Sequence, residues 1–121
     1  MIRRIATVAV YVDDQNAALE FWRDQVGFEV RRSESMGNAG VWLEVAPEGA
    51  DSRLVIYPKS AMDDWAERKP SIVFECDDIQ AAHDGMKSKG VKFDGEPRKM
   101  PWGTYATFSD PDGNEFLLKG P

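Results

Sequence analysis

The hexapeptide Asp13-Asp14-Gln15-Asn16-Ala17-Ala18 decides the fold, because its pattern recurs as Asp77-Asp78-Ile79-Gln80-Ala81-Ala82. The offset between the copies is 64 positions, from 13 to 77, in a chain of 121 residues. Self-similarity at a fixed period indicates that one structural unit is used twice. Two half-modules that face each other leave a cavity between them, so the repeat also predicts where a ligand binds.

An apolar run precedes each copy, and helical periodicity follows it. The runs at 8–12 and 72–76 are rich in β-branched residues and predict strands at 5–12 and 71–76. In each acidic pair, either carboxylate is suited to cap the following helix, because a side-chain oxygen there accepts from the free N–H groups of the first turn. Gly27 and Gly90 are expected to end the two helices.

Further strands complete two modules of the order β-α-β-β-β, which makes the expected fold class α+β. The additional strands are expected at 28–32, 41–45 and 53–57, and again at 91–93, 104–108 and 114–119. We therefore expect a single domain over 1–121, with module one at about 1–60, a connector at about 61–69 and module two at about 70–121.

Composition limits the partners and the compartment. The net charge of -6 argues against nucleic acid and against anionic membranes, since both favour clustered Lys and Arg. The single cysteine cannot form an internal disulfide, and Met1 leads into a strand rather than into the apolar stretch of a signal peptide. No segment reaches the roughly 20 apolar residues that a bilayer span needs. These features predict a soluble, cytoplasmic protein.

Several short motifs, in this order and spacing, resemble the vicinal oxygen chelate superfamily, which comprises glyoxalase I, bleomycin-resistance proteins and extradiol dioxygenases. The motifs are Val12-Asp13-Asp14, Ala18, Phe21-Trp22, Val26-Gly27-Phe28, Lys89-Gly90-Val91, Pro101-Trp102-Gly103 and Asp110-Pro111-Asp112-Gly113-Asn114. The resemblance implies that the two modules form an open eight-stranded cup with helices on the outside, usually in a homodimer. It does not fix the function, since one fold hosts many chemistries.

The resemblance also implies four metal-ligand positions, on the first and last strand of each module. In this sequence they fall on Thr7 and Ser71, on Ile56 with an uncertainty of one residue, and on Leu117. None of these side chains supplies the imidazole, thiolate or carboxylate that Zn, Ni, Fe or Mn requires. We therefore expect a protein without a metal or other cofactor.

The remaining reactive residue types favour structural roles. The only histidine, His83, lies on the second helix, away from the expected cup and without an expected partner nearby. Cys76 ends a strand and precedes two aspartates, whose charge disfavours a reactive thiolate, so a small buried hydrophobe is the expected role. No Gly-x-Ser-x-Gly elbow and no phosphate-binding glycine loop is present.

Strand alternation and one loop give a set of candidate binding residues. Side chains at every second position of a strand share a face, and the face opposite the helices is expected to line the cavity. The ligand-binding candidates are Thr7, Tyr11, Trp42, Ser71, Trp102, Tyr105 and Thr107. Glu44 and Glu75 lie on the same faces as possible counter-charges, or as weak candidates for a general acid and base.

Three functions remain open at this point. The first is a metal-free protein that binds an aromatic or amphipathic small molecule in the cup, as the bleomycin-resistance branch does. The second is a glyoxalase-like lyase or isomerase that uses a cup carboxylate as base. The third is an accessory protein whose cup is filled by its own side chains.

Overall fold

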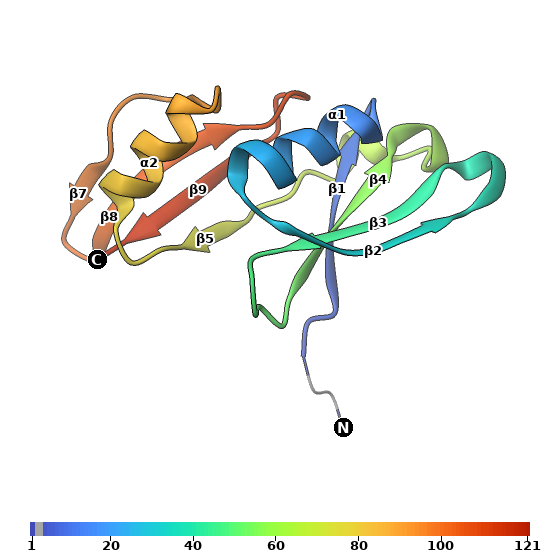
Figure 1. Cartoon of the computed structure of the whole chain (residues 1–121), viewed down its shortest axis with the longest axis horizontal. Helices are drawn as coiled ribbons and strands as arrows, with labels where there is room; N and C mark the ends of the chain where they lie inside the picture. The colour runs from blue at the N-terminus through green and yellow to red at the C-terminus, as the bar shows by residue number, and fades with distance from the viewer. Residues whose placement is uncertain (2–3) are drawn as a thin grey trace. The chain divides into compact units, whose positions relative to one another are not determined.

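A computed structural model describes Met1 and residues 4–121 of the chain (Figure 1). The chain divides into two compact units, unit 1 at Met1–Pro70 and unit 2 at Ser71–Pro121. Each unit contains one mixed sheet, in which some strand pairs are parallel and others antiparallel, and one main helix. None of the helices in the described part of the chain is long and apolar enough to cross a membrane.

Unit 1 has the predicted β-α-β-β-β order. Its elements are β1 (Thr7–Val12), α1 (Gln15–Glu20) with a π-helical continuation (Phe21–Val26), β2 (Glu29–Ser35), β3 (Val41–Ala46) and β4 (Arg53–Pro58). Short 3-10 turns occur at Gly37–Ala39, Lys59–Ala61 and Trp65–Glu67. The strand order is β1-β4-β3-β2, with β1 parallel to β4 and the other pairs antiparallel.

Unit 2 repeats this topology. Its elements are β5 (Val73–Glu75), α2 (Ile79–Ser88), β6 (Lys92–Phe93), β7 (Arg98–Met100), β8 (Gly103–Ser109) and β9 (Glu115–Gly120). The order β5-β9-β8-β6 places the first strand parallel to the last, as in unit 1. The internal repeat is therefore a repeat of structure, and the prediction of two β-α-β-β-β modules is confirmed.

The prediction of eight strands is wrong, since the described residues form nine. The additional strand, β7, pairs with β8 through three residue pairs, from Arg98↔Tyr105 to Met100↔Gly103. Its sequence, Arg98-Lys99-Met100, is fully exposed, lies between two prolines and has no apolar alternation. Only the proximity of β8 gives this segment a strand conformation, so no local pattern predicts it.

The first strand of unit 2 is also shorter than predicted. We expected residues 71–76, but β5 begins at Val73, and Ser71 precedes it with an exposed side chain. Ser71 directly follows Pro70, which has no N–H with which to extend the ladder toward the N-terminus. Ser71 is therefore not a strand residue of the sheet.

The two helices begin at equivalent aspartates. Asp14 Oδ1 accepts hydrogen bonds from the backbone N–H groups of Asn16 (2.9 Å) and Ala17 (3.2 Å). Asp78 Oδ1 accepts from the N–H of Ala81 at 3.1 Å. The second carboxylate of each acidic pair is thus the cap, and both helices start in the same register after the first strand.

Each helix covers one face of its own sheet and buries the apolar core there (Figure 1). In unit 1 the core side chains are Val10, Val12, Ala18, Phe21, Trp22, Leu43, Val45 and Ile56. In unit 2 they include Ile79, Met86, Ala106, Phe108, Phe116 and Leu118. In the described residues, the α-helix of each unit lies on that one side of its sheet, and we call the opposite side the helix-free face of the unit.

Candidate functional site

Strand register places most of the predicted binding residues on the two helix-free faces. In unit 1, Thr7 pairs with Arg53 and Tyr11 with Tyr57, and paired residues share a face. The alternation of β3 puts Trp42 and Glu44 on this same face, since Leu43 pairs with the buried Ile56.

In unit 2 the same argument places Tyr105 and Thr107 on the helix-free face. Tyr105 pairs with Lys119, and Thr107 pairs with Leu117. Glu75 joins them through its pairing with Lys119.

The predicted orientation of Ile56 is wrong. Ile56 was expected to point into the cavity, but it pairs with Val10 and Leu43 and is completely buried on the helix-covered face. Its strand neighbours Val55 and Tyr57 take the helix-free face instead. The error is one residue of register, which exchanges the two faces of a strand. Neither Val55 nor Tyr57 supplies an imidazole or a carboxylate, so the expectation of a protein without a metal is unaffected.

Three aromatic rings meet on the helix-free face of unit 1. The rings of Tyr11 and Tyr57 have centroids 6.0 Å apart at 62°, and those of Trp42 and Tyr57 are 5.9 Å apart at 90°. Both are edge-to-face contacts, the geometry that aromatic quadrupoles favour. Sequence reasoning missed Tyr57, although the correct register of β4 would have found it.

Glu44 lies next to these rings and is already engaged. Its Oε2 accepts a hydrogen bond from Trp42 Nε1 at 2.6 Å, and its Oε1 accepts from Arg53 Nη1 at 2.9 Å. The side chain of Glu44 is only 7% exposed. Burial raises the pKa of this carboxyl group, but the hydrogen bonds from Trp42 and Arg53 and the charge of Arg53 outweigh it, so the pKa is lowered overall. Glu44 is therefore an ionised, fully occupied acceptor and a poor general base.

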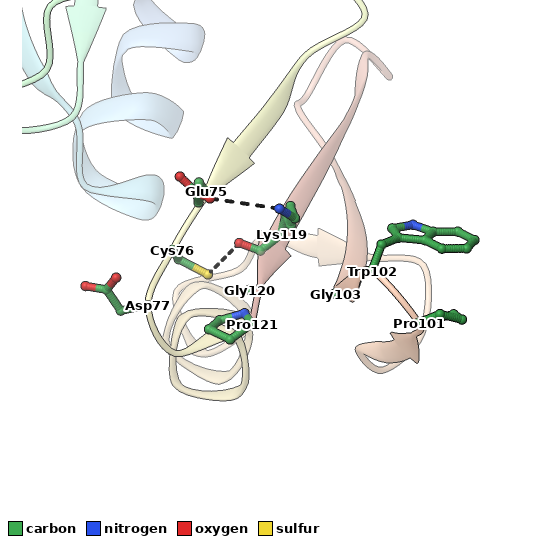
Figure 2. Close-up of a pocket in the computed structure, with 9 residues that line it drawn as sticks. All are labelled: Glu75, Cys76, Asp77, Pro101, Trp102, Gly103, Lys119, Gly120 and Pro121. Atoms are coloured by element: carbon green, nitrogen blue, oxygen red, sulfur yellow. Dashed lines mark hydrogen bonds and ion pairs between the residues drawn. The ribbon is translucent and has the colours of Figure 1, made fainter.

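A pocket of about 520 Å³ lies at one end of the helix-free face of unit 2 (Figure 2). Its lining consists of Glu75, Cys76, Asp77, Pro101, Trp102, Gly103, Lys119, Gly120 and Pro121. The pocket brings together two predicted site residues, Glu75 and Trp102, but not Ser71, Tyr105 or Thr107. Sequence reasoning missed Lys119, which β9 places beside Glu75.

Charged groups and an exposed indole define the chemistry of this pocket. Lys119 Nζ lies 4.0 Å from Glu75 Oε1, and Figure 2 shows the two side chains pointing toward each other. Trp102 is 68% exposed, and its indole points away from Lys119 (Figure 2). An indole held in water at the rim of a pocket of this size offers a surface on which a planar molecule can stack.

The surroundings of the Cys76 thiol disfavour its ionisation. Cys76 is half-buried rather than fully buried, and its Sγ donates to the carbonyl oxygen of Lys119 at 3.5 Å. Burial raises the pKa of this thiol, and the charges of Asp77, Asp78 and Glu75 raise it further. A neutral thiol is a weaker nucleophile than a thiolate.

The expectation that His83 has no partner nearby is wrong. Its side chain is 1% exposed, its Nδ1 lies 2.8 Å from Asp84 Oδ1, and its Nε2 lies 3.2 Å from Glu96 Oε2. The ring also packs against that of Phe93, with centroids 4.4 Å apart and a tilt of 58° between the planes. Glu96 is thirteen positions from His83 along the chain and reaches it only through the fold of the loop between β6 and β7, so no local pattern shows the contact.

The family follows from these features together with one comparison. Residues 4–118 match the family described as the Glyoxalase/Bleomycin resistance protein/Dioxygenase superfamily. The chain belongs to this superfamily. The predicted resemblance and the α+β fold class of this glyoxalase-type protein are therefore confirmed.

Related sequences of this glyoxalase-type protein include two from Bacillus subtilis (strain 168). Uncharacterized protein YetH is 55% identical over 119 residues, which cover 98% of this chain and 99% of YetH. Uncharacterized protein YurT is 33% identical, covering 92% of this chain and 94% of YurT.

Solved structures with a similar fold include a member of the same superfamily. A member of the superfamily from Sphaerobacter thermophilus has a TM-score of 0.89 at 31% identity, covering 99% of this chain and 98% of its own. TnmS3, an antibiotic binding protein from Streptomyces sp. CB03234, has a TM-score of 0.84 at 37% identity, covering 99% of this chain and 97% of its own. The superfamily thus includes, among the relatives of this chain, a protein whose role is binding.

Proposed function

We propose that this protein binds an aromatic or amphipathic small molecule on the helix-free face of a sheet, where binding needs no metal ion, in the cytoplasm and as a homodimer. The observation that carries the proposal is the cluster of Tyr11, Trp42 and Tyr57 in unit 1. The core under α1 is built from aliphatic side chains and from Phe21 and Trp22, whereas this face carries rings with polar tips.

The engagement of the carboxylates favours binding over catalysis. A general base needs a free oxygen within reach of the substrate and a pKa near the working pH. Each oxygen of Glu44 already accepts a hydrogen bond, one from Trp42 and one from Arg53. Burial raises the pKa of Glu44, but these two hydrogen bonds and the charge of Arg53 outweigh burial, so the pKa is lowered. The side chain of Glu75 is 82% exposed and pairs with Lys119 at 4.0 Å, so it is a solvated surface carboxylate.

The donor set supports a metal-free role. On the helix-free faces, the strand positions tested for metal ligation carry Thr7, Val55 or Tyr57, and Leu117. Hydroxyl and aliphatic side chains do not hold a transition metal. Elemental analysis of the purified protein measures bound transition metal, and a crystal structure with such an ion coordinated on the Thr7 or Leu117 strands would contradict this point.

A relative supports the ligand class. TnmS3 is described as an antibiotic binding protein and shares 37% of its sequence with this chain. Sequestration of a small molecule needs no catalytic group, which fits the side chains described above. We infer the same type of activity here, with the ligand defined by its chemistry: a planar ring system that stacks on indole and phenol side chains.

The four tryptophans make the proposal testable by fluorescence. Three planar probes that differ in charge would be titrated into the protein: acridine orange, 1-naphthol and 2-naphthoate. We expect at least one probe to quench tryptophan emission and to raise the melting temperature, since a ligand of the native state stabilises it. We expect no preference for the cation, because Arg53 already neutralises Glu44.

Substitutions locate the site. Trp42→Leu and Trp102→Leu should each weaken probe binding about tenfold, in line with the 1–3 kcal/mol that a stacking aromatic contributes. Trp65→Leu is the matched control, because Trp65 is also partly exposed but stacks on Lys59 in a turn outside both sites. If all three variants bind as the parent does, or if no probe binds, the proposed site is wrong.

A further inference from the structure

A buried imidazole and two carboxylates meet on unit 2, at α2 and the loop between β6 and β7. His83 lies on α2 with 1% of its side chain exposed, Asp84 follows it, and Glu96 comes from the loop. In residues 4–121, these three form the one group of at least three His, Cys, Asp or Glu side chains whose ligand atoms all lie within 4.8 Å of one another. The group lies apart from the helix-free face and has no part in the proposed function.

Asp84 fixes one side of the imidazole. Its Oδ1 lies 2.8 Å from His83 Nδ1 in a hydrogen bond, and it also accepts from Gln80 Nε2 at 3.0 Å. The hydrogen bond between Asp84 and Nδ1 fixes the orientation of the imidazole ring and directs Nε2 toward Glu96.

The Nε2 side of the ring has the spacing of a metal site. Nε2 is buried and makes no hydrogen bond within the described part of the chain, although Glu96 Oε2 is only 3.2 Å away. The two atoms are thus close without the alignment of a hydrogen bond. Two ligands at 2.0–2.1 Å from a tetrahedral zinc ion lie about 3.3 Å apart, which is close to the observed separation.

We propose that His83 Nε2 and the Glu96 carboxylate are the protein ligands of a divalent transition-metal ion of the zinc class, with Asp84 orienting the imidazole. Imidazole nitrogen and carboxylate oxygen form the donor set that zinc, nickel and cobalt accept. The side chain of Glu96 is 68% exposed, so an ion reaches the site from solvent and water completes its coordination. Such an ion ties the loop at 94–97 to α2.

The single histidine makes the test direct. The full-length protein, treated with a chelator and then titrated with zinc chloride, would be followed by long-range 1H–15N spectra, in which all imidazole signals belong to His83. We expect zinc to shift Nε2 to a metal-bound value while Nδ1 stays protonated. Glu96→Gln should weaken zinc binding at least tenfold, and Asp84→Asn about 10–100-fold, the usual loss for an orienting carboxylate.

Glu115→Gln serves as the control, because it removes an exposed carboxylate from β9 in the same unit. It should bind zinc as the parent does. The proposal is overturned if the His83 signals do not respond to millimolar zinc, if Nδ1 is the nitrogen that binds, or if Glu96→Gln binds zinc as tightly as the parent. Because Glu96 is exposed, its substitution tests the site without disturbing the core.

Discussion

Arg53 Nη1 lies 2.9 Å from Glu44 Oε1 and completes the hydrogen bonding of a carboxylate whose side chain is only 7% exposed. The two residues come from adjacent antiparallel strands, and β4 presents Arg53 on the same face as Glu44. A buried carboxylate without this partner would be strongly unfavourable. The ion pair therefore stabilises a buried carboxylate among the aromatic rings on the helix-free face of unit 1.

Loss of the guanidinium should destabilise the protein. Arg53→Met leaves Glu44 with Trp42 alone, and we expect the free energy of unfolding to fall by about 2 kcal/mol in urea denaturation. This is less than the roughly 3–5 kcal/mol of a fully buried pair, because the Arg53 side chain is 30% exposed. Arg23→Met makes the same change in the exposed pair with Asp24 and should cost much less, because surface ion pairs contribute little to stability. Equal losses in the two variants would show that burial of Glu44 does not matter.

The ionisation of Glu44 should appear in the acid stability of the protein. Burial acts to raise its pKa, but the Trp42 and Arg53 hydrogen bonds prevail, so the folded pKa lies below the ordinary value of 4.5. The stabilisation is therefore complete above 4.5 and is lost as the pH falls from there through the folded pKa. We expect Glu44→Gln to reduce the free energy of unfolding at pH 7 and to converge with the parent in acid. A difference that stays constant from pH 7 to acid would contradict this ionisation.

The two helix caps should contribute equally. Asp14→Ala and Asp78→Ala each remove an acceptor at the start of a helix and should each lower the free energy of unfolding by about 1 kcal/mol. Asp77→Ala removes the other carboxylate of the second pair, and its effect should stay within about 0.5 kcal/mol. A larger loss for Asp77 than for Asp78, measured by thermal or urea unfolding, would reverse the assignment of the cap.

Two glycines in unit 2 should respond in opposite directions to alanine. A Cβ at Gly120 would lie 2.8 Å from Ile79 Cβ, which cannot move without shifting α2, so Gly120→Ala should destabilise by about 1–3 kcal/mol. Gly85 lies inside α2 with nothing within 4 Å of the added Cβ, so Gly85→Ala should stabilise by about 0.5–1 kcal/mol. Melting temperatures that shift in the same direction would argue against the close approach of β9 to α2.

Much of the fold follows from the sequence because its signals are local. The repeated acidic pairs mark both helix starts, and apolar alternation marks the long strands, whose faces are then fixed by a period of two. The same logic placed Tyr11, Trp42, Tyr105 and Thr107 on the helix-free faces, where their register puts them. It failed at Ile56, where a one-residue uncertainty exchanges the faces, and at β7, which is a strand only because β8 pairs with it.

The sequence by itself determined the repeat, the acidic pairs that start both helices, the superfamily and the absence of metal-ligand side chains at Thr7 and Leu117, since each of these depends on residue identity and short-range spacing. The tertiary structure decided which groups meet: Arg53 with Glu44, Lys119 with Glu75, and Glu96 with His83. These partners are 9, 44 and 13 positions apart along the chain, counted from 44 to 53, from 75 to 119 and from 83 to 96. The distances between these paired side chains depend on strand register and on the path of the loops rather than on local propensity. The pairing determines the electrostatic surroundings of each charged group.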